Sequence, residues 1–406
     1  MRLSVILPCF NGAATITVQL DALARQEWAD GWEVVVVNNG STDNSVEIVE
    51  GYRNRLPGLK IVQAHVPGTL RLGVPHSYNT GIRAASGDAF VFCEADDEVG
   101  KGWLSAMGDA LREHQFVVAR VDHKKLNADW LHPHSYNGEG GQSAGLTGRQ
   151  HYPYMVAASG CTFGLSRSLY EAVGPLSTVF PMVADAEYCW RAQLAGFKLH
   201  FEPTALVHYR EKATLKGRFL QGRNWGRDFN RLLQYYGEPQ VRLGSLRQLV
   251  WMLRCLPEGA HGLLVMGMRF TQGRHLLAEW VWNMGWHAGK LLARRKPLQP
   301  RYRVLTGPEG TVVVVDAHPL HKRSKLALLK SWVGRGALSM TLAAPEVALA
   351  EDKRGLKGAG PRINAQQEYE LRDWALSLGV SREKLLEAVQ TVGDDAHRVR
   401  DYLRQR

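Results

Sequence analysis

A short apolar run at residues 89–93 ends in four acidic side chains within the next five positions: Glu94, Asp96, Asp97 and Glu98. A run of this length with polar neighbours predicts a buried strand. In open α/β sheets, ligands bind at the carboxyl ends of the strands. Adjacent carboxylates repel one another, so a fold that keeps them together usually offsets the repulsion with a cation. The stretch therefore predicts a divalent metal site, and the alternative is a solvated acidic loop.

Strand and helix patterns alternate over residues 1–110. Strands are predicted at residues 3–8, 33–37, 60–62 and 89–93, and helices at residues 14–26, 45–55 and 77–85. The alternation indicates βαβ units and a mainly parallel sheet, and the continuous apolar strands indicate that both faces of the sheet are covered. A dinucleotide-binding fold would need GxGxxG after the first strand, but residues 9–13 read CFNGA.

Four polar segments follow one another at the strand ends: SVILPCFN at residues 4–11, VVNNGSTD at 36–43, NTGIRAASGD at 79–88 and EADD at 94–97. In order and spacing they resemble the VIxPxYN, VDDGSTD, NxGxxxAxGD and DADD motifs of the family-two glycosyltransferases. The resemblance continues through DAEYCWRAQLAGF at 185–197 and LVHYR at 206–210, so it covers about residues 1–237. It implies the GT-A nucleotide-sugar-binding fold.

The activity implied by the resemblance is an inverting, metal-dependent glycosyltransferase of the hexosyltransferase kind. Such an enzyme moves a sugar from a nucleoside-diphosphate sugar to a hydroxyl acceptor, in the synthesis of bacterial polysaccharide, glycolipid or cell envelope. The cofactor would be a divalent metal, Mn²⁺ or Mg²⁺, acting as a Lewis acid and a template. The sequence does not identify the sugar, the nucleotide or the acceptor.

The metal ligands that the resemblance implies are Asp96, supported by Glu94 and Asp97, with His208 as a later ligand. Glu94 stands where the family has an aspartate, which changes the reach of this carboxylate. A histidine at a strand end is more often packed or hydrogen-bonded than bound to metal, so both interpretations of His208 stay open. The acids at positions 97 and 98 have the alternative role of capping the next helix.

The catalytic residues implied by the resemblance are Asp185 and Glu187. Asp185 aligns with the general base of the family, which takes the proton of the acceptor hydroxyl. Ala184 stands where the family has a glutamate. Glu187 is the alternative base, although it is also spaced to pair with Arg191 one helical turn later.

The donor-binding residues implied by the resemblance are Pro8, Asn11, Asn38, Asn39, Ser41, Arg71, Asn79, Glu94 and Ala95. Asn38 and Asn39 replace the aspartate that meets the nucleobase in the family, and an amide can still hydrogen-bond a base edge. Tyr78 replaces the basic residue before Asn79, so Arg71 is our candidate for the charge that meets the diphosphate. Asn79 itself has the alternative role of a helix cap.

Positive charge is concentrated in the middle of the chain. The whole sequence has 50 Lys and Arg against 39 Asp and Glu, a net charge of +11, and residues 238–345 alone carry 16 basic and 5 acidic side chains. Apolar, Trp-containing stretches lie among these cations at residues 246–296, a composition typical of helices on an anionic membrane surface. The alternative is a helical extension with solvated cations. No motif accompanies the charge that would indicate a nucleic-acid partner.

The expected organisation is a GT-A domain at residues 1–237, a basic amphipathic helical extension at 238–300, an unassigned segment at 301–350 and a small all-α domain at 351–406. Residues 352–405 resemble a small bacterial helical domain of unknown function, which we expect to bind a protein partner.

The cellular location can be predicted only coarsely. Five cysteines without a CxxC pair favour free thiols in a reducing compartment. Without a signal-peptide pattern or an apolar run of roughly 18–20 residues, we expect a cytoplasmic protein, peripheral on the inner face of the plasma membrane. The departures at Glu94, Ala184 and Asn38 leave a second hypothesis, a catalytically silent GT-A scaffold that acts in binding or assembly.

Overall fold

A computed structural model describes residues 1–69, 71–131, 142, 156–236, 250, 253–254, 256–268, 270–293, 302–306, 312–316, 363, 365, 371, 375, 378 and 380–404. The chain divides into two compact units, residues 1–213 with 356–406 and residues 214–355. The domain boundary expected at residue 237 stays a prediction. Within the segment left unassigned at 301–350, β9 (Tyr302–Thr306) pairs antiparallel with β10 (Val312–Asp316).

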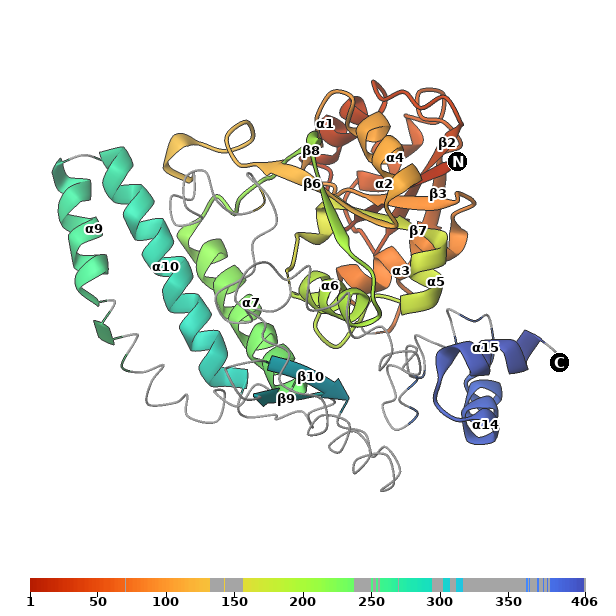
Figure 1. The fold of residues 1–406 in the computed structure, drawn as a ribbon. Helices are drawn as coiled ribbons and strands as arrows, with labels where there is room; N and C mark the ends of the chain where they lie inside the picture. The colour runs from red at the N-terminus through yellow and green to blue at the C-terminus, as the bar shows by residue number, and fades with distance from the viewer. Residues whose placement is uncertain are drawn as a thin grey trace. The chain divides into compact units, whose positions relative to one another are not determined.

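The first unit contains an eight-stranded mixed sheet in the order β3-β2-β1-β4-β7-β6-β8-β5 (Figure 1). The strands are β1 (Leu3–Cys9), β2 (Trp32–Asn38), β3 (Lys60–Gln63), β4 (Ala89–Phe92), β5 (Glu98–Val99), β6 (Phe116–Asp122), β7 (Phe163–Ser166) and β8 (Leu199–His208). The first four pair in parallel, and β7 then runs antiparallel between β4 and β6. The predicted α/β fold class is confirmed.

Helices connect these strands: α1 (Ile16–Leu23), α2 (Ser45–Glu50), α3 (Val74–Ala84), α4 (Trp103–Glu113), α5 (Arg167–Val173) and α6 (Ala184–Leu194). Helices α1 and α2 are shorter than the sequence pattern predicts. Helix α3 begins three residues before the predicted start at Ser77, because Pro75 lies in the first turn, where a helix needs no backbone donor. Every residue of β1 and β2 is buried, as the continuous apolar runs predict.

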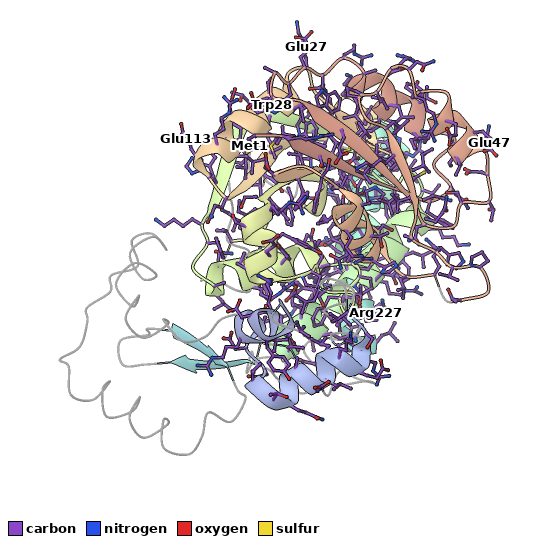
Figure 2. The ribbon with its side chains drawn as sticks, turned by 90° about the vertical axis from the view of Figure 1, so that its right-hand side faces the viewer. Met1, Glu27, Trp28, Glu47, Glu113 and Arg227 are labelled. Carbon is purple, nitrogen blue, oxygen red and sulfur yellow. The ribbon has the colours of Figure 1, made fainter. Side chains whose placement is uncertain are left out.

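One buried carboxylate fixes the amino-terminal edge of this sheet. Glu33 on β2 is inaccessible to solvent and accepts hydrogen bonds from Ser4 Oγ at 2.7 Å and from the Ser86 amide at 2.6 Å. Lys60 Nζ lies 2.8 Å from its second oxygen. At the same end of the sheet Trp28 Nε1 donates to the Met1 carbonyl at 2.9 Å, and both residues are labelled in Figure 2. The structural charges of this edge are therefore separate from the strand ends where the acids lie.

The second unit contains the helices α7 (Leu215–Tyr235), α9 (Leu256–Met268) and α10 (Phe270–Leu292), with α10 packed against α7 and α9 (Figure 1). Trp282 and Trp286 of α10 stack with ring centroids 5.4 Å apart, and Phe229 of α7 lies 5.3 Å from Trp286. None of the described helices combines the length and the apolar character needed to cross a membrane. Helices α9 and α10 lie within the helical extension expected at residues 238–300, whose bounds stay a prediction.

Near the carboxyl terminus the described residues include α14 (Arg382–Val392) and α15 (Ala396–Arg404). Ser381 caps α14 by accepting from the Lys384 amide at 3.3 Å, as its place before the helix predicts. Leu385 and Val399, one from each helix, are fully buried in a small apolar cluster. The all-α character expected for this segment is confirmed in the residues described.

Candidate active site

Two loops at the carboxyl ends of β1 and β2 are joined by hydrogen bonds. The Asn11 amide donates to Ser41 Oγ at 3.1 Å, the Thr42 amide donates to Asn11 Oδ1 at 2.8 Å, and the Gly12 amide donates to Ser45 Oγ at 2.8 Å. Asn11 has a positive φ of 48°, a conformation that asparagine tolerates better than most residues. The predicted residues Asn11 and Ser41 therefore hold the two loops together.

Asn38 and Asn39 are both buried but differ in their hydrogen bonds. Asn38 Nδ2 donates to Gln63 at 2.8 Å and its Oδ1 accepts from the Ser41 amide at 2.9 Å, so both ends of this amide are used. Asn39 Nδ2 donates to the Leu72 carbonyl at 2.7 Å, whereas its buried Oδ1 has no hydrogen-bond partner among the described residues. Because a buried acceptor without a partner is costly, Asn39 is the better candidate to meet a donor group of a ligand.

Arg71 lies at the edge of these loops. Its guanidinium carbon is 3.4 Å from the centroid of the Phe10 ring, which is 42% exposed. A cation over an aromatic face is held by the ring quadrupole. The structure thus places a positive charge next to the β1 loop, and its contact with a diphosphate stays a prediction.

Residues 94–97, the acid loop, connect β4 to β5, and their side chains differ in how deeply they are buried. Asp97 is 1% exposed; its Oδ1 accepts from the Arg210 amide at 2.9 Å, and its Oδ2 has no hydrogen-bond partner among the described residues. Burial, together with the charge of Glu94, holds the pKa of Asp97 well above its usual range. Arg210 Nε also donates to the Asp96 carbonyl at 2.8 Å.

Glu94 and Asp96 have different environments in the same loop. Burial, and then the charge of Asp96, raise the pKa of Glu94 to about 8, while Lys212 acts in the opposite direction. The charge of Asp185, 91 residues later, also raises this pKa, so α6 brings Asp185 within electrostatic range of the loop. Lys212 Nζ lies 3.2 Å from Asp96 Oδ2, and the two side chains are 49% and 36% exposed. Burial alone would lower the pKa of Lys212, but the charge of Asp96 outweighs it and the pKa is raised.

His208 ends β8, opposite Glu98 in the ladder with β5. Its Nδ1 lies 2.7 Å from Asp122 Oδ2. Burial opposes ionisation of Asp122, but the His208 bond and the backbone amides of Lys124 and Lys125 lower its pKa. A metal-binding histidine usually donates its other ring N–H to a carboxylate, which fixes the orientation of the ring. The same hydrogen bond also occurs in histidines that bind no metal. His208 as a metal ligand stays a prediction.

The carboxylates of the loop fit a divalent cation chemically. They are hard oxygen donors, and the partnerless Oδ2 of Asp97 is an acceptor that a cation would satisfy. However, within the described part of the chain no three His, Cys, Asp or Glu side chains are grouped as a metal site. Lys212 instead occupies one oxygen of Asp96. Binding of Mn²⁺ or Mg²⁺ through Asp96 Oδ2 would therefore require the lysine to move.

Asp185 lies in the first turn of α6. Its Oδ1 accepts from the Ala186 amide at 2.8 Å and its Oδ2 from the Gly160 amide at 3.3 Å. Gly160 precedes β7, the strand next to β4. Backbone donors orient the carboxylate without neutralising it, which suits a residue that must accept a proton.

Glu187, the alternative base, is used differently. It is 4% exposed and is bound by Arg191 through two contacts of 2.8 Å. Arg191 also donates to the Val173 carbonyl at 2.7 Å and to the Pro175 carbonyl at 2.8 Å. Pro175 lies in the segment that follows α5. This geometry supports a structural role for Glu187 and favours Asp185 as the base.

The remaining predicted residues lie in the frame of the site. Asn79 Nδ2 donates to the Leu176 carbonyl at 2.8 Å and its Oδ1 accepts from the Leu176 amide at 2.9 Å, so this side chain connects α3 to the segment after α5. Pro8 belongs to the buried strand β1, and Ala95 is 8% exposed in the acid loop. Their contacts with a donor stay predictions.

Sequence reasoning missed the roles of Arg210 and Lys212. Both contact the acid loop from more than 110 residues away in sequence. Their only signal in the sequence is their place directly after LVHY at the end of a predicted strand. The pairing of β8 with β5 brings this segment alongside the acids.

Residues 4–174 match the profile of glycosyl transferase family 2, and residues 359–404 match DUF3606, a family of proteins of unknown function. The chain is 33% identical over 130 residues to the uncharacterized glycosyltransferase YibD of Escherichia coli, covering 32% of this chain and 34% of that protein. It is 35% identical over 132 residues to the poly(ribitol-phosphate) beta-N-acetylglucosaminyltransferase TarS of Staphylococcus aureus, covering 31% and 22%. The chain thus spans about a third or less of these relatives.

Two solved structures are similar at low identity. The mannosyltransferase PcManGT of Pyrobaculum calidifontis, in complex with GDP-Man and Mn²⁺, matches with a TM-score of 0.49 and 18% identity, covering 73% of this chain and 88% of that one. S. aureus TarS 1–349 in complex with UDP matches with a TM-score of 0.42 and 19% identity, covering 78% and 97%.

Proposed function

We propose that this chain, whose residues 4–174 form a domain of glycosyl transferase family 2, transfers a sugar from a nucleoside-diphosphate sugar to a hydroxyl acceptor with inversion. The observation that carries the proposal is the approach of two carboxylates from distant segments. Glu94 follows the buried strand β4, and Asp185, in the first turn of α6, accepts from the amide of Gly160, just before β7, the antiparallel neighbour of β4. The charge of Asp185 also contributes to the raised pKa of Glu94. One acidic site for the leaving group and one for the acceptor are what this reaction needs.

In this proposal the nucleobase lies against the joined loops after β1 and β2. The partnerless Oδ1 of Asn39 accepts a hydrogen bond from an N–H group of the base. Arg71, held over Phe10, adds positive charge for the phosphates. These roles explain why a buried acceptor and an exposed cation lie on neighbouring loops.

The reaction centre lies between the acid loop and α6. A divalent metal bound by Asp96 and Glu94 would stabilise the charge that develops on the leaving diphosphate. Asp185, oriented by the amides of Gly160 and Ala186, takes the proton of the acceptor hydroxyl as the hydroxyl oxygen attacks the anomeric carbon. Attack from the face opposite the diphosphate gives inversion.

The test is a panel of nucleoside-diphosphate sugars with Mn²⁺ or Mg²⁺, read by release of the nucleoside diphosphate and by the thermal shift of the protein. We expect one nucleotide to raise the melting temperature in a metal-dependent way and one of its sugar donors to be hydrolysed slowly. If no donor turns over and no nucleotide binds with metal, the chain is better described as a silent scaffold.

We propose further that the second unit lies on an anionic membrane surface. Gly259 and Gly262 of α9 face α10. On the same helix Leu256, Leu263 and Leu264 are 50%, 54% and 64% exposed. This exposed apolar face, in a chain segment with excess positive charge, suits a helix in the lipid interface. The location would then be peripheral, on the cytoplasmic side, with a lipid or envelope polymer as acceptor and the DUF3606 segment available to a protein partner.

Co-sedimentation with vesicles tests the membrane proposal. We expect the full chain to bind vesicles of anionic phosphatidylglycerol at low salt and to bind neutral phosphatidylcholine vesicles less. Leu264→Asp should weaken the binding strongly, whereas Val66→Asp, at a position in the first unit with the same 64% exposure, should not. Equal binding by the two variants contradicts the proposed surface.

A further inference from the structure

We propose that Lys212 is an internal counter-ion of the acid loop: it occupies Asp96 until a divalent cation displaces it, and it then contacts the diphosphate of the donor. The inference deepens the proposed function and rests on it for the diphosphate contact. The displacement itself depends only on the charges that the structure places together. Lys212 would act on the leaving group next to the metal.

The position of Lys212 follows from the residues around it. The neighbouring Arg210 is fixed to the acid loop by two hydrogen bonds, from its amide to Asp97 and from its guanidinium to the Asp96 carbonyl. Residue 212 is therefore held beside the loop by its own backbone, and its ammonium reaches Asp96 Oδ2 at 3.2 Å. Arg210 is a positioning residue in this arrangement.

The contact between Lys212 and Asp96 can be broken easily. Both side chains are between one third and one half exposed, and exposed ion pairs contribute little to stability. A lysine ammonium is a point charge on a flexible stem, so it can change partners without a change in the backbone. By contrast, Asp97 is buried and its Oδ1 is held by the Arg210 amide.

A divalent cation that binds Asp96 through Oδ2 competes directly with Lys212, and one that binds through Oδ1 is repelled by the nearby ammonium. When the cation binds Asp96, the ammonium loses its partner but stays tethered beside the loop by Arg210. The group that brings new negative charge to this place is the diphosphate, and lysine is a common phosphate-binding residue. The leaving group would then be neutralised by two cations, one of them part of the chain.

The first test is calorimetric titration of the full chain with Mn²⁺ in the absence of nucleotide. We expect Lys212→Met to bind Mn²⁺ about tenfold more tightly than the wild type, because the competing charge is gone. Lys212→Arg, which keeps the charge, and Lys101→Met, at an exposed position of another loop, should bind as the wild type does. In a variant that already carries Asp96→Asn, the further substitution Lys212→Met should not tighten the binding of Mn²⁺.

The Mn²⁺ titration needs no donor, so it decides the competition whether or not the chain transfers sugar. Equal or weaker Mn²⁺ binding by Lys212→Met overturns the counter-ion role. A gain that persists in the Asp96→Asn background overturns the assignment of Asp96 as the contested ligand.

The second test is the binding of UDP and GDP at saturating Mn²⁺. Lys212→Met should weaken the binding of the preferred nucleotide about tenfold, and Lys212→Arg should restore most of it. Unchanged nucleotide binding by Lys212→Met overturns the diphosphate contact while leaving the Mn²⁺ result intact. Failure of the wild type to bind either nucleotide counts against the proposed function and against this contact together.

Discussion

Arg191 binds both carboxylate oxygens of Glu187, with Nε–Oε1 and Nη2–Oε2 distances of 2.8 Å. The pair lies on one face of α6, and the arginine continues to the backbone carbonyls of Val173 and Pro175. Asp185, only two residues before Glu187, receives backbone amides instead. Of the two acids in this helix turn, Glu187 is therefore held by an arginine, whereas Asp185 is held by backbone amides, as the proposed base would be.

The division predicts opposite results for two conservative substitutions. Asp185→Asn should lower the rate of transfer by about 10²–10⁴-fold, because the general base is lost, while the melting temperature changes little. Glu187→Gln should destabilise the protein by about 2–4 kcal/mol, because it leaves the buried end of Arg191, whose side chain is only 14% exposed, without its charged partner. Activity assays and urea unfolding of both variants provide the measurement. Full activity in Asp185→Asn would show that the base lies elsewhere.

The four parallel strands β1 to β4 could be predicted from the sequence because they are short apolar runs between polar segments, whereas β5, β6 and β7 were not predicted. The positions of Asn39 and of the acids after β4 also follow, since parallel strands place their carboxyl ends at one edge. The engagement of Asn79 with Leu176 could not be predicted, because it depends on a segment 97 residues away. The contact of Lys212 with Asp96 likewise depends on how β8 returns beside β5.

Glu33 predicts a pH-dependent part of the stability. Burial opposes its ionisation, but Lys60, Ser86 and Ser4 lower its pKa from 4.5 to about 2. Because the folded-state pKa is the lower one, the stabilisation is complete above about pH 4.5 and is lost as the pH falls toward 2. Glu33→Gln should therefore destabilise the protein by about 2–3 kcal/mol near neutral pH.

Urea unfolding across this pH range checks the prediction. The difference in unfolding free energy between wild type and Glu33→Gln should shrink between pH 4.5 and pH 2. Glu50→Gln, whose exposed carboxylate pairs only with Arg53 among the described residues, is the control and should change the stability little at any of these pH values. A difference that does not depend on pH would mean that packing, not charge, accounts for the effect.

Glu94 predicts a pH dependence of stability that is opposite in sign to that of Glu33. Its pKa is raised from 4.5 to about 8, so the folded protein loses stability as the pH rises from 4.5 toward 8 and this partly buried carboxylate ionises. With a chelator present, Glu94→Gln should match the wild type near pH 4.5 and melt several degrees higher at pH 8.5. Saturating Mn²⁺ should reduce or reverse this difference, because a bound cation stabilises the ionised wild-type carboxylate. Differential scanning calorimetry at these pH values measures both effects.

Helices α7 and α10 approach each other through glycines, a feature that the Arg- and Trp-rich sequence does not reveal. A Cβ at Gly226 would overlap the Trp286 carbonyl, and a Cβ at Gly289 would overlap the Arg223 carbonyl. Alanine is the better helix former by about 1 kcal/mol, so propensity alone predicts a gain from Gly226→Ala. The Cβ would meet backbone atoms rather than a flexible side chain, so the cost of overpacking should exceed the gain in helix propensity. We expect a net loss of about 1–3 kcal/mol in the free energy of unfolding.

The matched control for this last substitution is Gly267→Ala in α9, where an added Cβ meets nothing within 4 Å. It carries the same chemical change on an open helix surface and should be neutral or slightly stabilising. Hydrogen exchange of the full chain should show faster exchange in α7 and α10 for Gly226→Ala and no change for Gly267→Ala. If both variants are stabilised, the two helices are not as closely packed as their glycines require, and the proposed membrane surface on α9 would lack a rigid support.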